Sequence, residues 1–423
     1  MFLIVVLGFY LEKKYKNHTY AELILGVQGV STSIVKRAVL VFILLSLVSL
    51  FADIAYEGGR SVSGQYLELL GAPALAAGVL TVGEFLAYAL RLPASVVVST
   101  RKSDKFLWAM IVLGYALIVA IPLVAFTRNW YLVLALYFVE RVGKGLRSPA
   151  RDVVLADITD KAIGRGKGFA IHEVLDQVGA ILGPVIVSST LLMGLDYSYA
   201  FLALLPAVVI AVALVVTASL LYPRIEFTGR GTRQSQQLVK RSAIKSYLVF
   251  TSLLCLGFMH WSLVSYHVKR FGIVDEKVIP LFYALAMGID ALVAIPLGVL
   301  YDRKGLKTLI IVPLASLPIA PLLFLAGNTV TLTIASSLLG IVLCSYDSVL
   351  KAAAADFAES ASERAILFGW LGFVWGISWA IGNVLGGAMY DYLGPITLSI
   401  LFPAITLFSL VYLLKTLLER ELE

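Results

Sequence analysis

Ionisable side chains recur inside long apolar stretches of this chain, where a charge is costly. A charge at mid-bilayer depth costs at least about 3 kcal/mol unless it faces water or a partner. Counted by helix rise, Glu84, Arg141 and Asp176 each fall roughly 15–18 Å into their stretches. We expect these three to form one acid–base–acid cluster, in which the arginine is a permanent cation and the acids titrate. Such a cluster suits proton coupling, and a static ion pair that orders helices is the alternative.

Helical spacing places further polar residues on shared faces, because positions i, i+4 and i+7 of a helix point the same way. Three such sets are Asp53, Glu57 and Arg60; Glu84, Tyr88 and Arg91; and His172, Asp176 and Gly179. We predict coupling or translocation roles for Glu84, Arg141, Asp176, Asp53, Glu57 and Asp290. We predict that a substrate cavity is lined by Tyr88, Arg91, His172, Glu173, Gln177, His260 and Asp347.

Three charged residues follow the buried Arg141 at the end of the same stretch. Arg147, Arg151 and Asp152 would lie at the cytoplasmic mouth of the cavity. We favour gating salt bridges there over contact with substrate.

The elements that must position these residues are membrane-spanning helices. The chain is 60% hydrophobic and only 14% charged, whereas a soluble domain would carry nearer a quarter charged residues. Runs such as 106–126, 200–222 and 396–414 contain no charged residue, are long enough to cross a bilayer, and are continuous rather than alternating, which favours helices over barrel strands. We predict an all-α membrane protein with spans at 37–58, 72–98, 106–127, 130–150, 166–193, 198–222, 246–270, 279–301, 307–327, 330–352, 364–388 and 395–416.

The spans divide into two pseudo-symmetric six-helix halves, 36–222 and 246–416, joined by a polar, basic cytoplasmic linker at 223–245. A shift of 199 residues aligns Asp157 with Asp356 and Gly183 with Gly382, which supports an internal repeat. Residues 1–35 would form a cytoplasmic or interfacial segment and 417–423 a short tail. The third, sixth, ninth and twelfth spans carry no ionisable residue in their interiors, so we expect these four to face lipid.

The charge pattern sets the orientation and excludes some functions. The net charge of +7 arises from Lys and Arg in short loops on one side, which predicts both termini in the cytoplasm and argues against nucleic acid as a partner. Cys255 and Cys344 fall inside spans and indicate neither a disulfide framework nor a metal site. We expect no cofactor and no enzyme activity, since no nucleophile–base pair or metal set has suitable spacing. Partners would be the lipid bilayer of the plasma membrane, a small molecule and protons, and the protein would be a monomer.

The segment Gly298-Val-Leu-Tyr-Asp302-Arg303-Lys304-Gly305 resembles the loop signature of major facilitator superfamily transporters. The resemblance implies gating roles for Gly298, Asp302, Arg303 and Gly305. Gly298 would allow close helix approach, Gly305 would make a tight turn, and Asp302 would pair with cations of the neighbouring loop. The equivalent first-half loop, 95–102, lacks the acid.

Two more motifs carry the resemblance. Arg141 with Gly145 resembles the mid-membrane arginine motif that the superfamily associates with proton coupling. Gly179-Ala-Ile-Leu-Gly183-Pro184 resembles the helix-packing motif of drug–proton antiporters, although the paired glycines after the proline are missing. Four stretches also look like an uncharacterised prokaryotic branch: Asp53…Tyr56-Glu57…Arg60, Glu84…Tyr88…Arg91, Arg147…Pro149-Ala-Arg151-Asp152 and His172-Glu173…Asp176-Gln177.

The resemblance, which covers about residues 36–415, implies a twelve-helix secondary transporter whose halves rock around a central site. We expect proton-coupled export of a small organic molecule, with lipid-like cargo also open. The alternatives are a uniporter or importer whose charges bind substrate directly, and a non-transporting receptor or scaffold.

Overall fold

The computed structural model describes residues 32–101, 103–162, 165–222, 240–358 and 361–418. Most of the predicted 1–35 segment and of the 223–245 linker, and the end of the 417–423 tail, lie outside these residues. All of the regular structure described is helical. The first half consists of α3 (Thr32–Leu69), α4 (Ala74–Arg101), α5 (Asp104–Ala116) with its continuations η1 (Leu117–Val119), α6 (Ala120–Leu123) and η2 (Val124–Phe126), α7 (Trp130–Ala162), α8 (Arg165–Leu192), α9 (Tyr197–Leu202) and α10 (Leu205–Leu221).

The second half has more interruptions. Its elements are α11 (Lys240–Leu256), α12 (Trp261–Arg270), η3 (Glu276–Val278), α13 (Ile279–Lys304), η4 (Gly305–Ile310), α14 (Ile311–Ser316), α15 (Ile319–Pro321), η5 (Leu322–Ala326), α16 (Thr329–Ser345), η6 (Tyr346–Leu350), α17 (Lys351–Asp356), α18 (Ala361–Leu393), η7 (Pro395–Thr397), α19 (Leu398–Leu413) and η8 (Leu414–Leu418).

The twelve predicted spans are present. Ten described helical segments are long and apolar enough to cross a membrane, and one of them, Glu276–Ala326, holds two predicted spans. The remaining predicted span is α7, which is long enough to cross a membrane but carries too many charged residues to count as apolar. Several predicted ends were wrong: α3 runs to Leu69 rather than 58, and α7 to Ala162 rather than 150. Polar residues continue these helices because the backbone bonds of a helix do not require apolar side chains.

The seventh span is broken, which the apolar pattern did not predict. α11 ends at Leu256 and α12 begins at Trp261, with His260 as its N-cap. The side chain of Asn383 on α18 holds the break: its oxygen accepts from the His260 N–H (2.8 Å), and its nitrogen donates to the Phe258 carbonyl (3.0 Å). The amide therefore satisfies backbone groups that a continuous helix would have paired internally.

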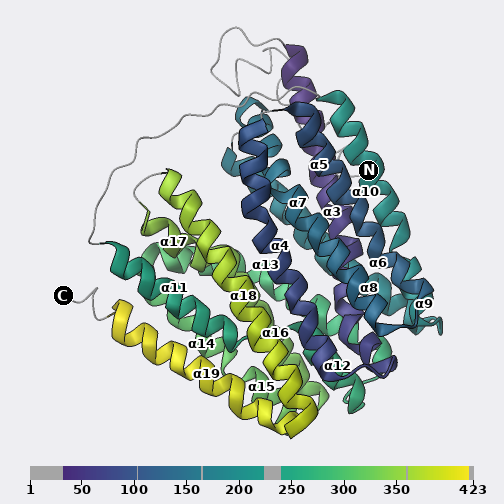
Figure 1. Cartoon of the computed structure of the whole chain (residues 1–423), viewed down its shortest axis with the longest axis vertical. Coiled ribbons are helices and arrows are strands. Elements are labelled where there is room, and N and C mark those ends of the chain that lie inside the picture. Colours follow the sequence, from purple (N-terminus) through teal and green to yellow (C-terminus); the bar gives the residue numbers. More distant parts are fainter. Residues whose placement is uncertain (1–31, 102, 163–164, 223–239, 359–360, 419–423) are drawn as a thin grey trace.

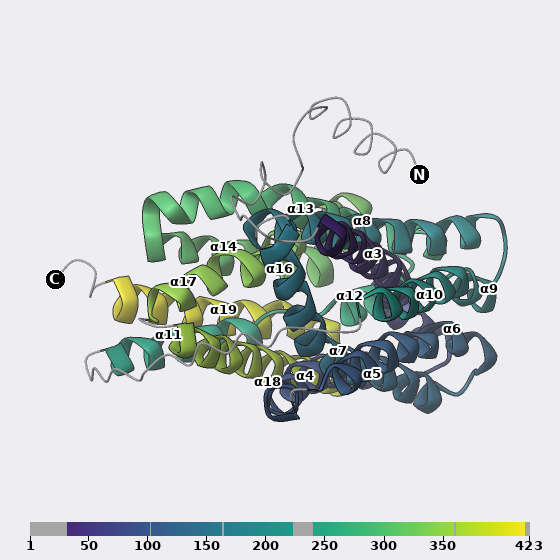
Figure 2. The same cartoon turned by 90° about the horizontal axis from the view of Figure 1, so that it is seen from above.

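The halves lie side by side, closest at the end that carries α9 and α12, and their helices diverge toward the end that carries α17 (Figure 1). Figure 2, seen from above, shows α17 and α19 of the second half on the left and α9 and α10 of the first half on the right. At the close end the backbones touch. A Cβ on Gly64 of α3 would lie 1.7 Å from the Ser262 carbonyl oxygen of α12, and one on Gly78 of α4 would lie 2.2 Å from the Asn383 carbonyl oxygen of α18.

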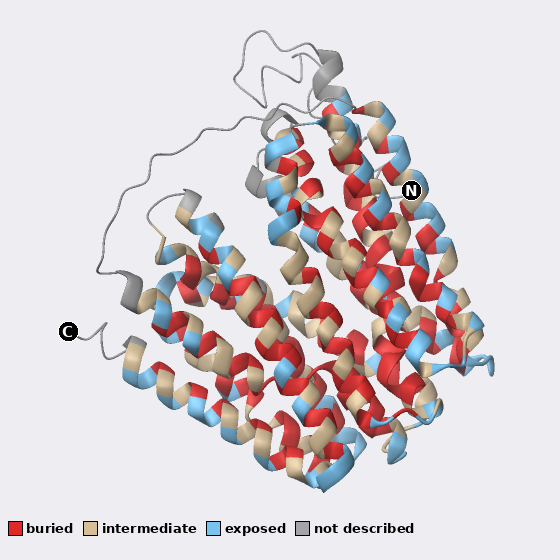
Figure 3. Ribbon diagram, viewed as in Figure 1, coloured by how far each residue is buried: buried red, intermediate tan, exposed pale blue. Residues whose placement is uncertain are grey.

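Buried residues concentrate where helices face one another, and the outer faces are exposed (Figure 3). Large apolar side chains stand on those outer faces, such as Leu220 of α10 (76% exposed) and Ile400 of α19 (68%). A soluble protein would bury this much apolar surface, whereas a membrane protein turns it to lipid. The sixth and twelfth spans therefore present the lipid-facing surface expected of them.

Candidate functional site

A cavity of about 300 Å³ lies between the two halves. Half of its 26 lining residues are charged: Asp53, Glu57, Arg60, Glu84, Arg91, Lys144, Arg147, Arg151, Asp152, Glu173, Asp176, Asp290 and Lys351. Of the predicted cavity residues, Tyr88, Arg91, Glu173 and Gln177 line it. The side chain of Asp347 lies outside the described residues.

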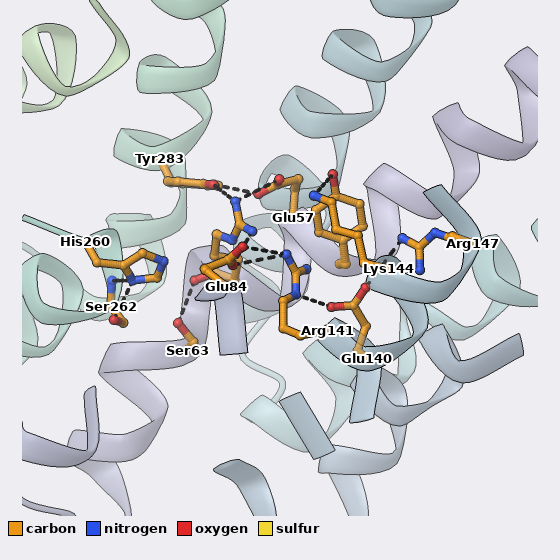
Figure 4. A network of polar contacts seen from close by, with 12 residues as sticks. Glu57, Ser63, Glu84, Glu140, Arg141, Lys144, Arg147, His260, Ser262 and Tyr283 are labelled. Atoms are coloured by element: carbon orange, nitrogen blue, oxygen red, sulfur yellow. Dashed lines mark hydrogen bonds and ion pairs between the residues drawn. The ribbon is translucent and has the colours of Figure 1, made fainter. Parts of the chain in front are cut away.

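Glu84 of α4 is the centre of a buried polar network (Figure 4). The Arg60 Nη2 atom lies 2.5 Å from Glu84 Oε1, and Arg141 Nη1 donates to both carboxylate oxygens at 3.0 and 3.1 Å. Two guanidinium groups from α3 and α7 therefore hold one carboxylate. A buried charge held in this way is costly to release, because the partners would be left uncompensated.

The network continues in both directions from Glu84. On one side Arg60 also pairs with Glu57 at 3.0 Å. On the other side Arg141 Nε lies 2.5 Å from Glu140, whose second oxygen is 3.6 Å from Arg147. Three carboxylates and three guanidinium groups alternate along this path, so their formal charges cancel.

One phenol joins the network from the second half. The Tyr283 hydroxyl of α13 donates to Glu57 Oε2 at 2.6 Å and accepts from Arg60 Nη1 at 3.3 Å. In the first half, Lys144 Nζ donates to the Tyr56 hydroxyl at 3.2 Å. Apart from Tyr283, the ionic partners described here all belong to α3, α4 and α7.

The predicted cluster of Glu84, Arg141 and Asp176 forms only in part. Glu84 and Arg141 meet as expected, but the second carboxylate on Arg141 is Glu140, and among the described side chains Asp176 forms no ion pair with that arginine. Glu140 adjoins Arg141 in the sequence, and its position inside the same apolar stretch was the available signal. Spacing along one helix gives a face, whereas the choice of partner depends on distances between helices.

Asp176 of α8 instead belongs to a second group of acids with Asp53 of α3. The Ser49 hydroxyl hydrogen-bonds to Asp176, and His172 Nε2 lies 3.9 Å from its Oδ1. Asp53 and Asp176 lie within electrostatic range of each other, and both line the cavity. These two carboxylates are therefore cavity-facing acids on neighbouring helices.

The two histidines predicted to line the cavity do not do so. His172 is buried, with Nδ1 3.3 Å from the Ser46 hydroxyl of α3. His260 caps α12 through its Nδ1, which accepts from the Ser262 N–H at 3.1 Å, and its ring packs on Trp379. His172 therefore packs on α3, whereas His260 lines a second, much smaller cavity with Arg60 of α3 and Tyr283 of α13.

The predicted mouth residues make contacts inside the first half. Arg151 donates to the adjacent Asp152 (2.9 Å), and both side chains line the cavity. Arg147 is buried and donates to the Gly114 carbonyl of α5 at 3.0 Å. In this conformation the contacts described for these residues do not bridge the halves, so a gating role stays a prediction.

The loop signature after α13 is confirmed at one glycine and not at another. Gly305 has a φ of 56°, which only glycine adopts readily, and it ends α13. A Cβ on Gly298 would meet nothing within 4 Å, so the close helix approach predicted there was wrong for this conformation. Asp302 and Arg303 are exposed.

The glycines of the α8 motif pack as predicted. A Cβ on Gly179 would lie 2.4 Å from the Leu50 carbonyl oxygen, and one on Gly183 would lie 2.3 Å from that of Ile54. Pro184 follows inside α8. Because Leu50 and Ile54 belong to α3, this motif joins two helices of the same half.

The end opposite the divergence is sealed by hydrogen bonds between the halves. Asp391 of α18 accepts from the first two N–H groups of α4: Ala74 to Oδ1 (2.9 Å) and Leu75 to Oδ2 (2.8 Å). The Tyr266 hydroxyl donates to the Ala72 carbonyl (2.8 Å), and the Trp261 indole donates to that of Ser61 (2.8 Å). A carboxylate at a helix N-terminus satisfies orphan donors and complements the helix dipole. We call these contacts the seal.

Relatives and solved structures resemble the chain over most of its length. A protein of Mycobacterium tuberculosis (strain ATCC 25618 / H37Rv), itself uncharacterised, is 35% identical over 384 residues, which are 88% of this chain and 92% of that protein. An uncharacterised MFS-type transporter of Methanocaldococcus jannaschii is 26% identical over 200 residues, 44% of this chain and 48% of that one.

The fold matches solved transporters at low sequence identity. The nucleoside transporter NupG superimposes with a TM-score of 0.67 at 14% identity, covering 88% of this chain and 97% of that one. A POT family transporter in complex with 5-aminolevulinic acid gives 0.68 at 17% identity, covering 89% and 96%. The profile of the Major Facilitator Superfamily matches residues 38–312 and 271–422. The chain is a membrane transporter that belongs to the Major Facilitator Superfamily.

Proposed function

We propose that this chain is a proton-coupled secondary transporter that exports a small polar organic molecule by alternating access. The supporting observation is the charged cavity between the halves, which Asp53, Glu84 and Asp176 all line; among the described side chains, Glu84 alone of these three is held by two guanidinium groups. Thirteen charged lining residues match a polar solute. An apolar or lipid-like cargo would leave those charges without water or partners, so it fits this cavity poorly.

The coupling site in this proposal is the pair Asp53 and Asp176. Glu84 is held by Arg60 and Arg141, so a proton on Glu84 would leave two buried cations uncompensated. Asp53 and Asp176 repel each other across the cavity wall, and a proton shared between them removes that repulsion. The charges around them are Lys144 and Arg147 of α7 and Glu57 of α3 near Asp53, and Arg151 of α7 and Glu173 of α8 near Asp176.

Protonation would then favour closure of the cavity. A neutral carboxyl group costs far less to enclose than a carboxylate, so a protonated pair lets the halves approach. Release of the proton and arrival of the substrate would alternate across the cycle. Export is proposed because the α8 motif resembles that of drug–proton antiporters. Its two glycines pack against a helix of the same half.

The open end is assigned to the cytoplasm in this proposal. Exposed cations gather at that end on the described residues: Arg101, Lys105, Lys245, Arg303, Lys304, Lys307 and Arg364. The sealed end carries fewer exposed cations on the described residues, namely Arg128 and Arg270. Lysine and arginine favour the cytoplasmic side of a membrane, which supports an inward-open assignment of the observed conformation.

A transport assay tests the coupling. Proteoliposomes that contain a pH-sensitive dye would receive amino acids, dipeptides, dicarboxylates, nucleosides and organic amines with no imposed gradient. One class should trigger proton movement. In Asp53→Asn and Asp176→Asn that movement should fall at least about 10-fold while labelled compound still equilibrates. Glu68→Gln, at the sealed end of the same helix as Asp53, is the matched control.

Proton movement that persists in the Asp53→Asn, Asp176→Asn double variant would contradict coupling through this pair. The second candidate is a uniporter or importer, favoured by the six cations that also line the cavity. Equilibration of a compound by the wild-type protein without proton movement, and insensitive to a proton ionophore, would support that candidate instead.

A further inference from the structure

Two tyrosines meet across the cavity from opposite halves. Tyr88 of α4 and Tyr346 of η6 have ring centroids 5.7 Å apart at an interplanar angle of 68°, an edge-to-face arrangement. A Cβ on Gly372 of α18 would lie 3.3 Å from both side chains, and one on Gly376 would lie 3.0 Å from Tyr88. The glycines therefore leave room for Tyr88 to seat against the second half.

Each tyrosine carries a cation on its ring. The Arg91 guanidinium carbon lies 5.0 Å from the Tyr88 centroid, and Lys351 Nζ lies 5.2 Å from that of Tyr346. Arg91 is one helical turn after Tyr88. Lys351 is five residues after Tyr346, and η6 is a π-helix, whose i→i+5 hydrogen bonds bring that position back near the ring.

Arg91 differs from the arginines of the buried network. Arg60 and Arg141 each bind two carboxylates. Among the side chains that the structure describes, none forms an ion pair with Arg91, and its buried Nε has no hydrogen-bond partner. A guanidinium fork that faces a cavity without a carboxylate is suited to bind an anion that arrives from solution.

We propose that Arg91 and Lys351 form an anion clasp, which binds an anionic group of the transported molecule between the two halves. The chemistry that fits is a carboxylate or a phosphate on a small organic molecule. This inference rests on the proposed transport function and narrows its substrate class to organic anions, including zwitterions. The acids on the α3 and α8 side of the cavity are then left to the proton or to a cationic group of the same solute.

The clasp also gives the substrate a way to drive closure. Arg91 and Lys351 belong to opposite halves, so an anion that contacts both would join the halves across their boundary. A ligand shifts a conformational equilibrium only through such differential interaction with the two states.

Binding to the purified full-length protein tests the clasp. Trp375 lies 4.5 Å from Tyr346 and makes intrinsic fluorescence a local readout. Succinate, glutamate, citrate, glucose 6-phosphate and inorganic phosphate would be titrated at constant ionic strength, with neutral succinamide as the matched probe. We expect saturable quenching by at least one anion and none by succinamide. Carboxylates and phosphates in separate titrations distinguish the two possible anionic groups.

Variants assign the binding to the two cations. Arg91→Gln and Lys351→Gln should each weaken the binding of that anion about 10-fold or more, as expected when a charge-assisted contact is lost. Arg91→Lys keeps the positive charge but not the guanidinium fork, so it should lose less affinity for the anion than Arg91→Gln does. Arg128→Gln, an exposed cation at the sealed end, is the control and should bind as the wild type does.

Three outcomes would overturn the clasp: no anion of the panel binds the wild type, succinamide binds as well as succinate, or Arg91→Gln binds with unchanged affinity. The proposed coupling fails separately. A wild type that binds the anion but moves no protons contradicts coupling and leaves the clasp in place. Proton movement driven by a neutral compound and unchanged in Arg91→Gln would contradict the clasp and leave coupling in place.

Discussion

The two halves line the cavity with different kinds of side chain. The first half supplies eleven of its thirteen charged lining residues, whereas the second supplies Asp290 and Lys351 beside Met287, Leu343, Tyr346, Trp375 and Trp379. Charges that are paired within one half keep their partners when the halves move. The second-half side chains Tyr346, Trp375 and Trp379, here called the aromatic wall, face these charges. This wall can move at a smaller cost in free energy, because it has few charges to desolvate.

The ion-pair network shows this division most clearly. Its carboxylates and guanidinium groups come from α3, α4 and α7, and only the Tyr283 hydroxyl crosses to the second half. Among the described residues, motion between the halves would therefore require only the two contacts of this phenol, with Glu57 and Arg60, to change within this network. Three variants would break or sharpen this contrast.

The largest effect is expected for Arg141→Gln. The substitution leaves Glu84 and Glu140 buried without their shared cation, a loss of about 3–5 kcal/mol in folded-state stability. The measurement is the apparent unfolding temperature of the purified protein. Lys351→Gln, the cation on the aromatic wall, should lower it by much less. Equal losses in the two variants would contradict the assignment of structural charge to the first half.

Asp391 is the clearest case of a second-half charge used across the boundary. Asp391→Ala removes two hydrogen bonds from the seal, worth about 1–2 kcal/mol together. It should shift the ratio of the observed conformation to one open at the sealed end about 10-fold. Spin labels at the exposed positions Leu69 and Tyr392 would report it as a longer-distance population. Asp391→Asn should shift the ratio less, and an unaltered distance distribution in Asp391→Ala would mean that the cap does not hold the seal.

The smallest effect is expected for Trp379→Phe in the aromatic wall. The indole Nε1 of Trp379 is buried without a hydrogen-bond partner among the described residues, so its removal costs no bond. Stability should change by less than about 1 kcal/mol, with transport retained. The unfolding assay checks stability and the liposome assay checks transport. A large loss of stability or of transport would mean that the Trp379 indole N–H makes a functional polar contact.

The sequence was sufficient for the fold because its signals are local. Uncharged runs of about twenty residues specify spans, and buried charges identify the wet face of each helix. The break at 257–260 was not foreseen, because it depends on Asn383 more than a hundred residues later. The ninth span is likewise divided into short helices around Pro313, Pro318 and Pro321, whose effects on neighbouring turns the apolar pattern does not report.

The sequence predicted which residues line the site better than it predicted which of them form ion pairs. Asp53, Glu57, Glu84, Arg91 and Asp176 line the cavity as expected from charge inside apolar stretches. Which acid meets Arg141 depends on the tilt and rotation of α4, α7 and α8, which the spacing within one helix does not contain. The histidines were misplaced for the same reason, since the facing helix decides whether a side chain packs or meets water.

The wide turn at η6 has a genetic consequence. A π turn holds one residue more than an α turn needs, so loss of a single codon between Tyr346 and Lys351 would restore an ordinary helix. The lysine would then stand four residues after Tyr346 in an α-helix, which is the same face, so the cation would stay over the ring. A single in-frame deletion would therefore remove the wide turn and keep the cation on the ring, a separation of the two features that no point substitution gives.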